Sequence, residues 1–541
     1  MLENLEYIGV LWYKYAMFNR PKDKSFESDN FHQIIANLSA ENRNLVSRLE
    51  SSNTQTKNLV LENQLLREQV KLLRAKRFGK SSEKLQGHDG QLEFWEEENI
   101  TEAQELESPP ADQEESKNEK RKPKRKKLPA HLPRESIVLN PDPKCPDCGG
   151  EEFRTISEDT SETLEYVEAL FKVIEHIRPR CVCTGCEKIV QAYPASKAID
   201  KGIAGPGLLA HILVQKYCNH LPIYRQHEIY AREGIEIPKS TMVSWASQCA
   251  ELLKPLIAEL DKEIFLSREL HGDDTPIKVL SNSPKKTKTG RLWVYARDGR
   301  NYGSKIPPAV RYFYSPDRKG ERPKAHLKDF KGVLHAYAYS GYDHLYPSKD
   351  NPTSEIIESA CWAHTRRKFY EITVANNKAN IAIEILGQIS KLYKVEKKIR
   401  GLPPDERLDH RQKESKILVD QLFKAIKSYR EDLPSKSATS KAINYALNNE
   451  NALKRFLDDG RIEIDNNTAE RALRPIAVGR KNWLFAGSDK GGETAAAIFS
   501  LIETAKINGI NPHGYLKKVL ETINDYNSTK LHELLPWNIN L

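Results

Sequence analysis

The chain has 541 residues, a length that allows three or four domains of ordinary size. Its 84 Lys and Arg residues exceed its 75 Asp and Glu residues by 9, and this mild basic excess suits a polyanionic partner without excluding other functions. It contains no apolar run of about 18 residues, the length that a membrane-spanning helix needs, so no membrane association is expected.

The N-terminal region predicts a coiled coil. Residues 1–30 form an extension to which no role can be assigned, and residues 31–86 carry a heptad pattern in which Leu recurs at one position while apolar residues and Asn share the other. This pattern is typical of a short parallel coiled coil, in which buried Asn fixes the register. We therefore expect a leucine zipper that makes the chain a homo-oligomer. The alternative is a single amphipathic helix packed on its own domain, which the polar flanks disfavour. The recurring residues are Leu38, Leu45, Leu59, Leu66 and Leu73.

Residues 87–135 predict a charged, disordered linker. Their first half is acidic, and the second contains "KRKPKRKK" from Lys120 to Lys127, with seven basic residues in eight. Charge blocks with Pro and few aromatic residues cannot bury enough surface to fold. Two interpretations stay open for the basic run: it contacts phosphates of bound DNA, or it is a solvated tether.

Residues 136–195 predict a zinc-binding domain. Two CxxC motifs lie in "CPDCGG" and "CVCTGC", and the segment between them alternates like the strands of a zinc ribbon. Paired CxxC motifs can place four thiolates tetrahedrally around one Zn²⁺, a closed shell with a structural role. Clustered cysteines in a chain without a recognisable secretion signal favour metal binding over disulfides and predict a cytoplasmic protein. The expected zinc ligands are Cys145, Cys148, Cys183 and Cys186; the alternative is a reduced, metal-free cluster.

Residues 200–262 predict a helical module. A helix, a turn with Gly234, and a second helix with polar residues at its start resemble a helix-turn-helix. Lys239, Ser240 and Thr241 at that start are the expected DNA contacts. Helices that pack by apolar contact without any DNA are the alternative interpretation.

Residues 265–515 predict a mixed sheet covered by helices, since short strands come first and helices follow. A charged helical insertion is expected at about 385–458, and residues 516–541 are interpreted as a C-terminal tail. The overall prediction is a multidomain α+β protein.

Acidic residues near the ends of elements indicate the chemistry of this region. They occur in "HGDDTP" and in "IDNNTAERALRP", and between them "KGVLHAYAYSGYDHLY" predicts a buried strand. Polynucleotidyl transfer needs carboxylates from separate elements around two Mg²⁺ ions, which prefer such oxygen ligands. Acids at strand ends or helix starts are more often structural, so spacing alone does not establish the site.

The order and wording of these segments resemble the transposases of the insertion-sequence 66 family over nearly everything after residue 31. The resemblance is carried by "RFGKSSEKL", "CPDCGG", "LPIYRQHEIYAREGIEIPKSTMVSW", "HGDDTPIKVL", "CWAHTRRKF", "IEIDNNTAERALRPIAVGRKNWLFAGSDKGGE" and "LLPWN". It implies an RNase H-like catalytic domain with an Asp-Asp-Glu triad, structural Zn²⁺ and two catalytic Mg²⁺ ions. It also implies DNA recombination at the terminal inverted repeats of a mobile element and into target DNA.

Carried over residue by residue, the resemblance gives Asp273 as the first catalytic acid and Glu470 as the third. The position of the second holds Tyr337, because the family pattern "LQADAYAG" falls on "LHAYAYSG". A phenol is a poor Mg²⁺ ligand near neutral pH, since its unperturbed pKa is about 10, so this copy is expected to be impaired. The neighbours or substitutes considered are Asp274, Asp343 and Asp465.

Basic residues near these acids are expected to contact DNA phosphates, and solvated helix faces are the alternative. They are His364, Arg366, Arg367, Arg471, Arg474, Arg480 and Lys481.

Two functions from different classes remain. The first is a transposase, nucleoid-associated in a bacterium, with helper proteins of the same element as further partners. The second is a non-catalytic DNA-binding regulator, or a dominant-negative partner of intact copies. An RNA-processing nuclease lacks support, because no pattern for 2′-hydroxyl recognition is present.

Overall fold

The computed structural model describes residues 14, 27–78, 132–140, 144–167, 170–281, 287–337, 339–347, 351–376 and 379–540. Most of the N-terminal extension and nearly all of the predicted linker therefore lie outside the described residues. The chain divides into two compact units, each described by itself: Met1–Phe78 with Lys436–Ala438, and Gly79–Ser435 with Thr439–Leu541. Among the described helices, none is both long and apolar enough to cross a bilayer.

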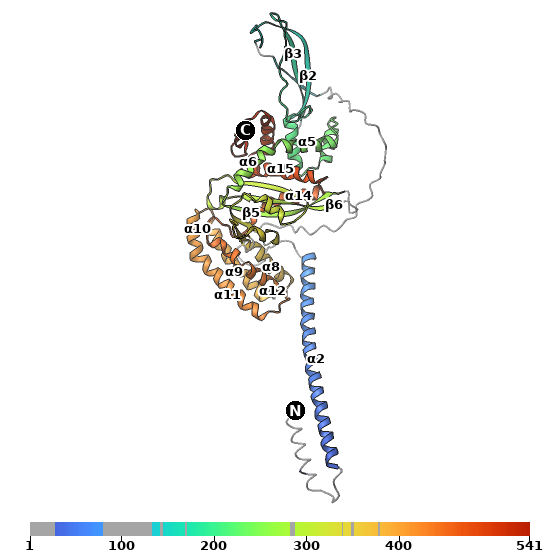
Figure 1. The fold of residues 1–541 in the computed structure, drawn as a ribbon, viewed down its shortest axis with the longest axis vertical. Helices are drawn as coiled ribbons and strands as arrows, with labels where there is room; N and C mark the ends of the chain where they lie inside the picture. Colours follow the sequence, from blue (N-terminus) through green and yellow to red (C-terminus); the bar gives the residue numbers. More distant parts are fainter. Residues whose placement is uncertain are drawn as a thin grey trace, which may run out of the picture. The chain divides into compact units, whose positions relative to one another are not determined.

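The first unit contains one continuous helix, α2 (Glu27–Phe78), of 52 residues (Figure 1). The segment contains neither Gly nor Pro, the two residues that most disfavour a helix interior. Its heptad leucines are exposed, from 50% for Leu45 to 67% for Leu73. An exposed apolar seam on this helix is compatible with the predicted zipper. Self-association itself stays a prediction.

A four-stranded sheet carries the two CxxC motifs. In it β2 and β3 form a long antiparallel hairpin that pairs Phe153 with Cys183, while β1 runs parallel to β3 and β4 pairs with β3 (Figure 1). The hairpin register brings the loop before β2 beside the loop after β3. The strands are β1 (Arg134–Val138), β2 (Phe153–Val167), β3 (Leu170–Cys183) and β4 (Ile189–Gln191).

Four helices form the module that follows. Helices α3, α4 and α5 contact one another, and Gly234, with φ of 80°, adopts the left-handed conformation that glycine favours in the turn between α4 and α5. Helix α5 buries Met242 and Trp245. The helices are α3 (Pro206–Tyr217), α4 (Ile223–Arg232), α5 (Lys239–Leu252) and α6 (Lys254–Phe265).

The C-terminal residues belong to this packed region. Helix α16 (Pro512–Thr522) contacts α3, and the 3₁₀ segment η6 (Ser528–Leu534) contacts α6. Tyr515, Leu516 and Leu535 are fully buried. The described residues of the segment interpreted from sequence as a tail, 516–540, thus contribute several side chains to the core.

A five-stranded mixed sheet forms the centre of the second unit. Its order is β7-β6-β5-β8-β9; β7, β6 and β5 are antiparallel, whereas β5, β8 and β9 are parallel. Helices α14 (Asn467–Asn482) and α15 (Asp489–Ile507) contact it (Figure 1). The strands are β5 (Glu269–Leu280), β6 (Thr287–Arg297), β7 (Ala309–Ser315), β8 (Gly332–Ala336) and β9 (Ile356–Ala360). Short connecting elements are η1 (Arg300–Tyr302), α7 (Glu321–His326) and η2 (Ser340–Leu345).

A helical insertion lies between β9 and α14 in the chain (Figure 1). It consists of α8 (Trp362–Ala375), α9 (Asn380–Ile399), α10 (Pro404–His410), a π-helical turn (Arg411–Ser415), α11 (Lys416–Asp432), α12 (Ala438–Asn448), α13 (Glu450–Lys454) and η4 (Arg455–Leu457).

A buried arginine fastens the insertion to the segment that leads into α14. Arg411 is 0% exposed and donates to the Glu396 carboxylate at 2.8 and 2.7 Å. It also donates to the carbonyls of Phe456, Asp459 and Ile462. One guanidinium therefore satisfies a buried carboxylate and three backbone acceptors at once.

We predict that Arg411→Leu lowers the free energy of unfolding by about 3–5 kcal/mol, because three backbone carbonyls lose their donor and the Glu396 carboxylate keeps only the 3.4 Å contact with Arg407. Thermal unfolding measures the change. Lys413→Leu is the control: Lys413 pairs with Asp409 at the surface, with 70% of its side chain exposed, and should change stability by about 0.5 kcal/mol at most. Equal effects of the two substitutions would contradict the role given to Arg411.

Candidate zinc site and candidate acidic site

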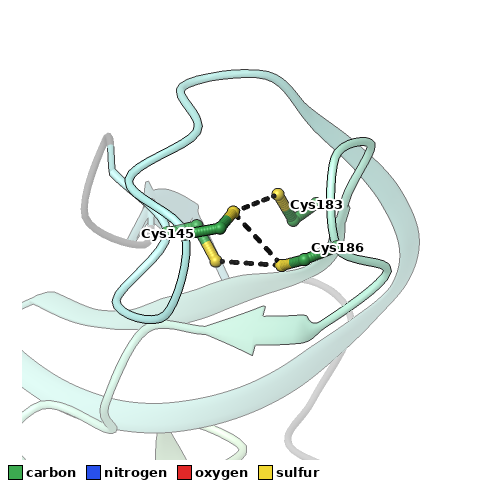
Figure 2. Close-up of side chains that lie close together, drawn as sticks. Cys145, Cys183 and Cys186 are labelled. Atoms are coloured by element: carbon green, nitrogen blue, oxygen red, sulfur yellow. Dashed lines mark hydrogen bonds between the residues drawn. The ribbon is translucent and has the colours of Figure 1, made fainter.

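The four predicted zinc ligands converge. Their Sγ atoms all lie within 4.8 Å of one another, and Cys145–Cys186, Cys148–Cys183 and Cys148–Cys186 are 3.4, 3.5 and 3.3 Å apart. Figure 2 shows Cys145, Cys183 and Cys186 pointing toward one another from two separate loops. Tetrahedral zinc with four thiolates needs sulfur–sulfur separations of about 3.8 Å, so the cluster fits one ion.

The backbone around Cys145 also favours the thiolate form that binds metal. Hydrogen bonds from the backbone N–H groups of Asp147 and Cys148 lower the pKa of Cys145 to about 6, which favours the thiolate form. Gly149, with φ of 71°, makes the tight turn that aims these N–H groups. Cys181, the fifth cysteine of this region, lies beside the Thr155 hydroxyl at 3.7 Å instead.

The predicted acidic positions meet at one edge of the five-stranded sheet. The parallel register pairs His271 with His335, and continuing it by two residues sets Asp273 level with Tyr337. The next register pairs Ala336 with Ala360, so Tyr337 is level with Cys361. Adjacent parallel strands thus bring Asp273, Tyr337 and Cys361 to one edge.

Asp273 is a buried carboxylate without an ion-pair partner within the described part of the chain, although the charge of Arg318 acts on it from further away. It is 9% exposed and accepts a 2.7 Å hydrogen bond from the backbone N–H of Asp274. Burial raises the pKa of Asp273 well above its ordinary value, and the charges of Asp274 and Glu470 raise it further. The folded chain therefore holds Asp273 close enough to Glu470 for mutual repulsion, as a cation site requires.

Asp274, unlike Asp273, lies beside two cationic side chains. Arg318 donates to it at 2.8 and 3.0 Å, and Arg291 lies 3.1 Å from the same carboxylate. Its side chain is 0% exposed. Because two guanidinium groups already neutralise Asp274, it is poorly placed to serve as a metal ligand.

Tyr337 turns its hydroxyl toward Asp274. The phenol donates a 2.6 Å hydrogen bond to Asp274 Oδ1, and the ring stacks on His364 with centroids 5.6 Å apart. The guanidinium of Arg318 lies 5.6 Å from the ring centroid. The phenol occupies the edge between the carboxylates without adding a negative ligand to it.

Glu470 lies in the first turn of α14, facing the start of α8. Its Oε1 is 3.5 Å from His364 Nδ1. His364 directs this nitrogen toward Glu470, and burial lowers the pKa of its imidazole. Its predicted contact with DNA stays a prediction. The start of α8 is held by a 3.1 Å hydrogen bond from Trp362 N–H to the Ile464 carbonyl.

Asn466 holds the edge together, and sequence reasoning missed it. Its side chain is fully buried, donates to the Gly272 carbonyl at 2.9 Å and pairs with His271 Nδ1 at 3.1 Å. Its backbone N–H donates to Cys361 Sγ at 3.2 Å. The "DNN" motif before the helix could have indicated Asn466, but only its aspartate, Asp465, was predicted to have a role. Arg318 and Arg291 were missed as well, because no local pattern pairs them with Asp274.

The substitutes considered for Tyr337 lie elsewhere. Asp343 is exposed on η2 and its charge acts on Glu358 and Tyr346, so the structure does not bring it into the buried pair around Asp273. Asp465 accepts hydrogen bonds from Asn467, and burial raises its pKa to about 7. Asp465 thus forms its hydrogen bonds at the start of α14.

The predicted DNA contacts fall into two groups. Lys239 and Ser240 are exposed at the start of α5, and Thr241 is half-buried there. Near the acidic site, Arg471 contacts Thr468 and Arg480 contacts the Pro276 carbonyl, whereas Arg474 and Lys481 are exposed on α14. Arg366 lies 5.6 Å from the Tyr370 ring, and Arg367 is half-buried one residue further along α8.

Comparison with family models identifies a class of DNA-rearranging protein. Residues 201–494, which contain the helical module, the sheet and Asp273, Tyr337 and Glu470, match the model described as "Transposase IS66 family". Because this match covers more than half of the chain, the chain belongs to the IS66 family of transposases, as the sequence motifs predicted. Residues 142–187 match "zinc-finger binding domain of transposase IS66", residues 65–137 "Transposase C of IS166 homeodomain", and residues 500–537 "IS66 C-terminal element".

Similar chains occur in Sinorhizobium fredii. The uncharacterized protein y4hP is 37% identical over 429 residues, which is 77% of this chain and 77% of y4hP. The uncharacterized protein y4qI is 36% identical over 475 residues, which is 87% of this chain and 88% of y4qI. The likeness therefore extends over most of both proteins. The zinc-finger match and the geometry of the four cysteines together support structural zinc.

We predict that the double substitution Cys145→Ser/Cys148→Ser removes about one zinc equivalent per chain and loosens the β2–β3 hairpin, because structural zinc contributes directly to folding. Elemental analysis gives the zinc content, and limited proteolysis reports the hairpin. Cys181→Ser is the control and should retain the metal. An unchanged zinc content in the double variant would contradict the assignment.

We predict that Asp273→Asn stabilises the fold at pH 7 by about 1–2 kcal/mol. At this pH the unfolded chain ionises Asp273, whereas the folded chain favours the protonated form, so folding carries a cost that the amide lacks. As the pH falls through the ordinary aspartate range near 4, the unfolded state also takes up the proton and the advantage disappears.

Thermal unfolding of both chains between pH 4 and 7 measures this difference. The matched control is Asp329→Asn, at an aspartate whose side chain is 72% exposed and 3.8 Å from Lys328, which should change stability by about 0.5 kcal/mol at most across this pH range. An advantage of Asp273→Asn that persists at pH 4 would mean that its origin is not the buried charge.

Proposed function

We propose that this chain is a DNA transposase whose phosphoryl-transfer centre is impaired by Tyr337. The observation that carries the proposal is the 2.9 Å hydrogen bond from Asn466 to the Gly272 carbonyl, which joins the segment that carries half-buried Glu470 to the strand that carries buried Asp273. The two carboxylates are near enough for the charge of Glu470 to raise the pKa of Asp273. The sheet order, three antiparallel strands followed by two parallel ones, supports an RNase H-like catalytic domain. On that fold, acids at the ends of neighbouring strands and on a following helix face one another.

The donor set fits one Mg²⁺ ion better than two. Asp273 and Glu470 provide two oxygen ligands without their own cationic partners at hydrogen-bond distance among the described residues, as a hard divalent ion prefers. A cation there supplies the Lewis acid for an attacking oxygen at phosphorus. Asp274 is neutralised by two arginines and Tyr337 brings no carboxylate, so the second ion lacks ligands.

DNA binding is proposed for the helical module and for the zinc-bearing hairpin. Lys239 and Ser240 are exposed at the start of α5, where polar side chains and backbone N–H groups can contact phosphates. The exposed leucine seam of α2 supports pairing of two copies, which suits recognition of the two inverted ends of an element. The proposed setting is bacterial nucleoid DNA, with helper proteins of the same element.

A second function is favoured by one specific contact. The Tyr337 phenol donates a 2.6 Å hydrogen bond to Asp274, and this bond stabilises the phenol at the acidic edge. A chain that keeps the zipper and the DNA-binding modules but cannot cut would act as a regulator, or as a dominant-negative partner that pairs with intact copies. This alternative differs from the first only in the level of strand cleavage.

We predict that Tyr337→Asp raises Mg²⁺-dependent nicking of a plasmid carrying the element's own inverted repeats by about 100-fold or more, because a missing metal ligand costs several kcal/mol at the transition state. Tyr337→Phe is the matched control: it removes the bond to Asp274 without adding a ligand and should stay inactive. Adding Glu470→Gln to Tyr337→Asp should abolish the gain.

Efficient nicking by the unaltered chain would refute the impairment. Binding of the repeats by a Tyr337→Asp chain that still fails to nick would favour the regulator instead.

A further inference from the structure

Three different ligand types meet beside the acidic pair. Cys361 follows β9, His364 lies in the first turn of α8, and Glu470 lies in the first turn of α14. One ligand atom from each, the thiol sulfur, an imidazole nitrogen and a carboxylate oxygen, lies within 4.8 Å of the other two. None of them belongs to the cysteine cluster of the hairpin.

The separations suit a small tetrahedral ion. Zinc bound to sulfur, nitrogen and oxygen at its usual bond lengths sets these atoms about 3.4–3.6 Å apart. His364 Nδ1 and Glu470 Oε1 are already 3.5 Å apart. The sulfur of Cys361 lies within 4.8 Å of both atoms, so small changes of side-chain torsion can bring the three donors to bonding distance of one ion.

The sulfur of Cys361 is buried beside acidic groups. It accepts a 3.2 Å hydrogen bond from the backbone N–H of Asn466. Burial and the charges of Glu470 and Asp465 hold the pKa of the free thiol well above its ordinary value. A cation at this position would offset that repulsion, because a thiol that coordinates a metal loses its proton. Cys361 also occupies the N-cap position of the 14-residue helix α8, where the helix dipole favours negative charge.

The imidazole of His364 provides an independent indication. Its Nδ1 atom is buried and has no hydrogen-bond partner within the described part of the chain. Buried polar atoms nearly always have a partner, and an exception commonly marks an unfilled ligand position. This nitrogen points toward Glu470, while the ring face is held by Tyr337 at 5.6 Å.

The geometry points to a mononuclear site for Zn²⁺, or a similar borderline divalent cation, held by Cys361 Sγ, His364 Nδ1 and the Glu470 carboxylate. Sulfur and imidazole ligands select zinc-like ions over Mg²⁺. Three protein ligands leave one coordination position open, unlike the closed shell of the four cysteines. The bound ion fixes the first turn of α14 against the end of β9 and keeps Glu470 beside Asp273. The inference does not depend on DNA cleavage, because it concerns metal binding alone.

The test measures zinc in the purified full chain after exposure to ZnCl₂ and gel filtration. The unaltered chain should retain about two equivalents, and Cys145→Ser/Cys148→Ser, which leaves the new site untouched, about one. Zinc K-edge absorption of that variant should show a mixed shell of one sulfur with nitrogen and oxygen. Excess MgCl₂ should not displace this ion.

The ligands are assigned by adding further substitutions to the Cys145→Ser/Cys148→Ser variant. Adding Cys361→Ser or His364→Gln should remove the remaining zinc, whereas adding Cys218→Ser, at a cysteine outside both groups, should retain it. Circular dichroism checks that each variant is folded. Loss of all zinc in Cys145→Ser/Cys148→Ser alone, or an all-sulfur shell in that variant, would overturn the inference without affecting the proposed transposase function.

Discussion

The acidic edge depends on one buried amide. Asn466 joins the Gly272 carbonyl and His271 of β5 to the start of α14, and its backbone N–H reaches Cys361 after β9. These contacts join residues 194, 195 and 105 positions apart in the chain. Because Asn466 is fully buried, loss of any partner leaves a polar atom unsatisfied, at a cost of about 1–3 kcal/mol. This penalty keeps Glu470 close to the ends of the parallel strands, where repulsion between carboxylates would otherwise separate them.

Charge is distributed unequally between two adjacent aspartates. Asp274 lies between Arg318 and Arg291 and receives the Tyr337 hydroxyl, whereas Asp273 accepts a hydrogen bond from the backbone and senses the charge of Glu470. Asp274 is therefore neutralised by two guanidinium groups, whereas Asp273 is buried without an ion-pair partner in the described part of the chain. A strongly perturbed buried carboxylate is often compensated by a cation or a substrate. This difference is the reason why the proposal above assigns the metal to Asp273 rather than to Asp274.

Tyr337 changes the chemistry of this edge without disrupting its packing. The phenol finds a hydrogen-bond partner, a stacked imidazole and a guanidinium nearby, so a bulky side chain is accommodated where the sequence resemblance predicts a carboxylate. Sulfur, nitrogen and oxygen donors lie together around Glu470. In the sites proposed above, this mixed set of donors favours zinc-like over magnesium-like ions.

Local patterns in the sequence determined the long N-terminal helix, the paired CxxC knuckles, the succession of strands and helices, and the family, because periodicity and short motifs are encoded by neighbouring residues. The tertiary structure alone decided which carboxylate is neutralised, that His364 faces Glu470, that Asn466 joins the three segments and that side chains from residues 516–540 pack in the core. It also left Asp343 exposed and away from the buried acids. Each of these outcomes depends on strand register and on contacts between distant segments, and a one-dimensional pattern does not contain the register that sets Asp273, Tyr337 and Cys361 level with one another.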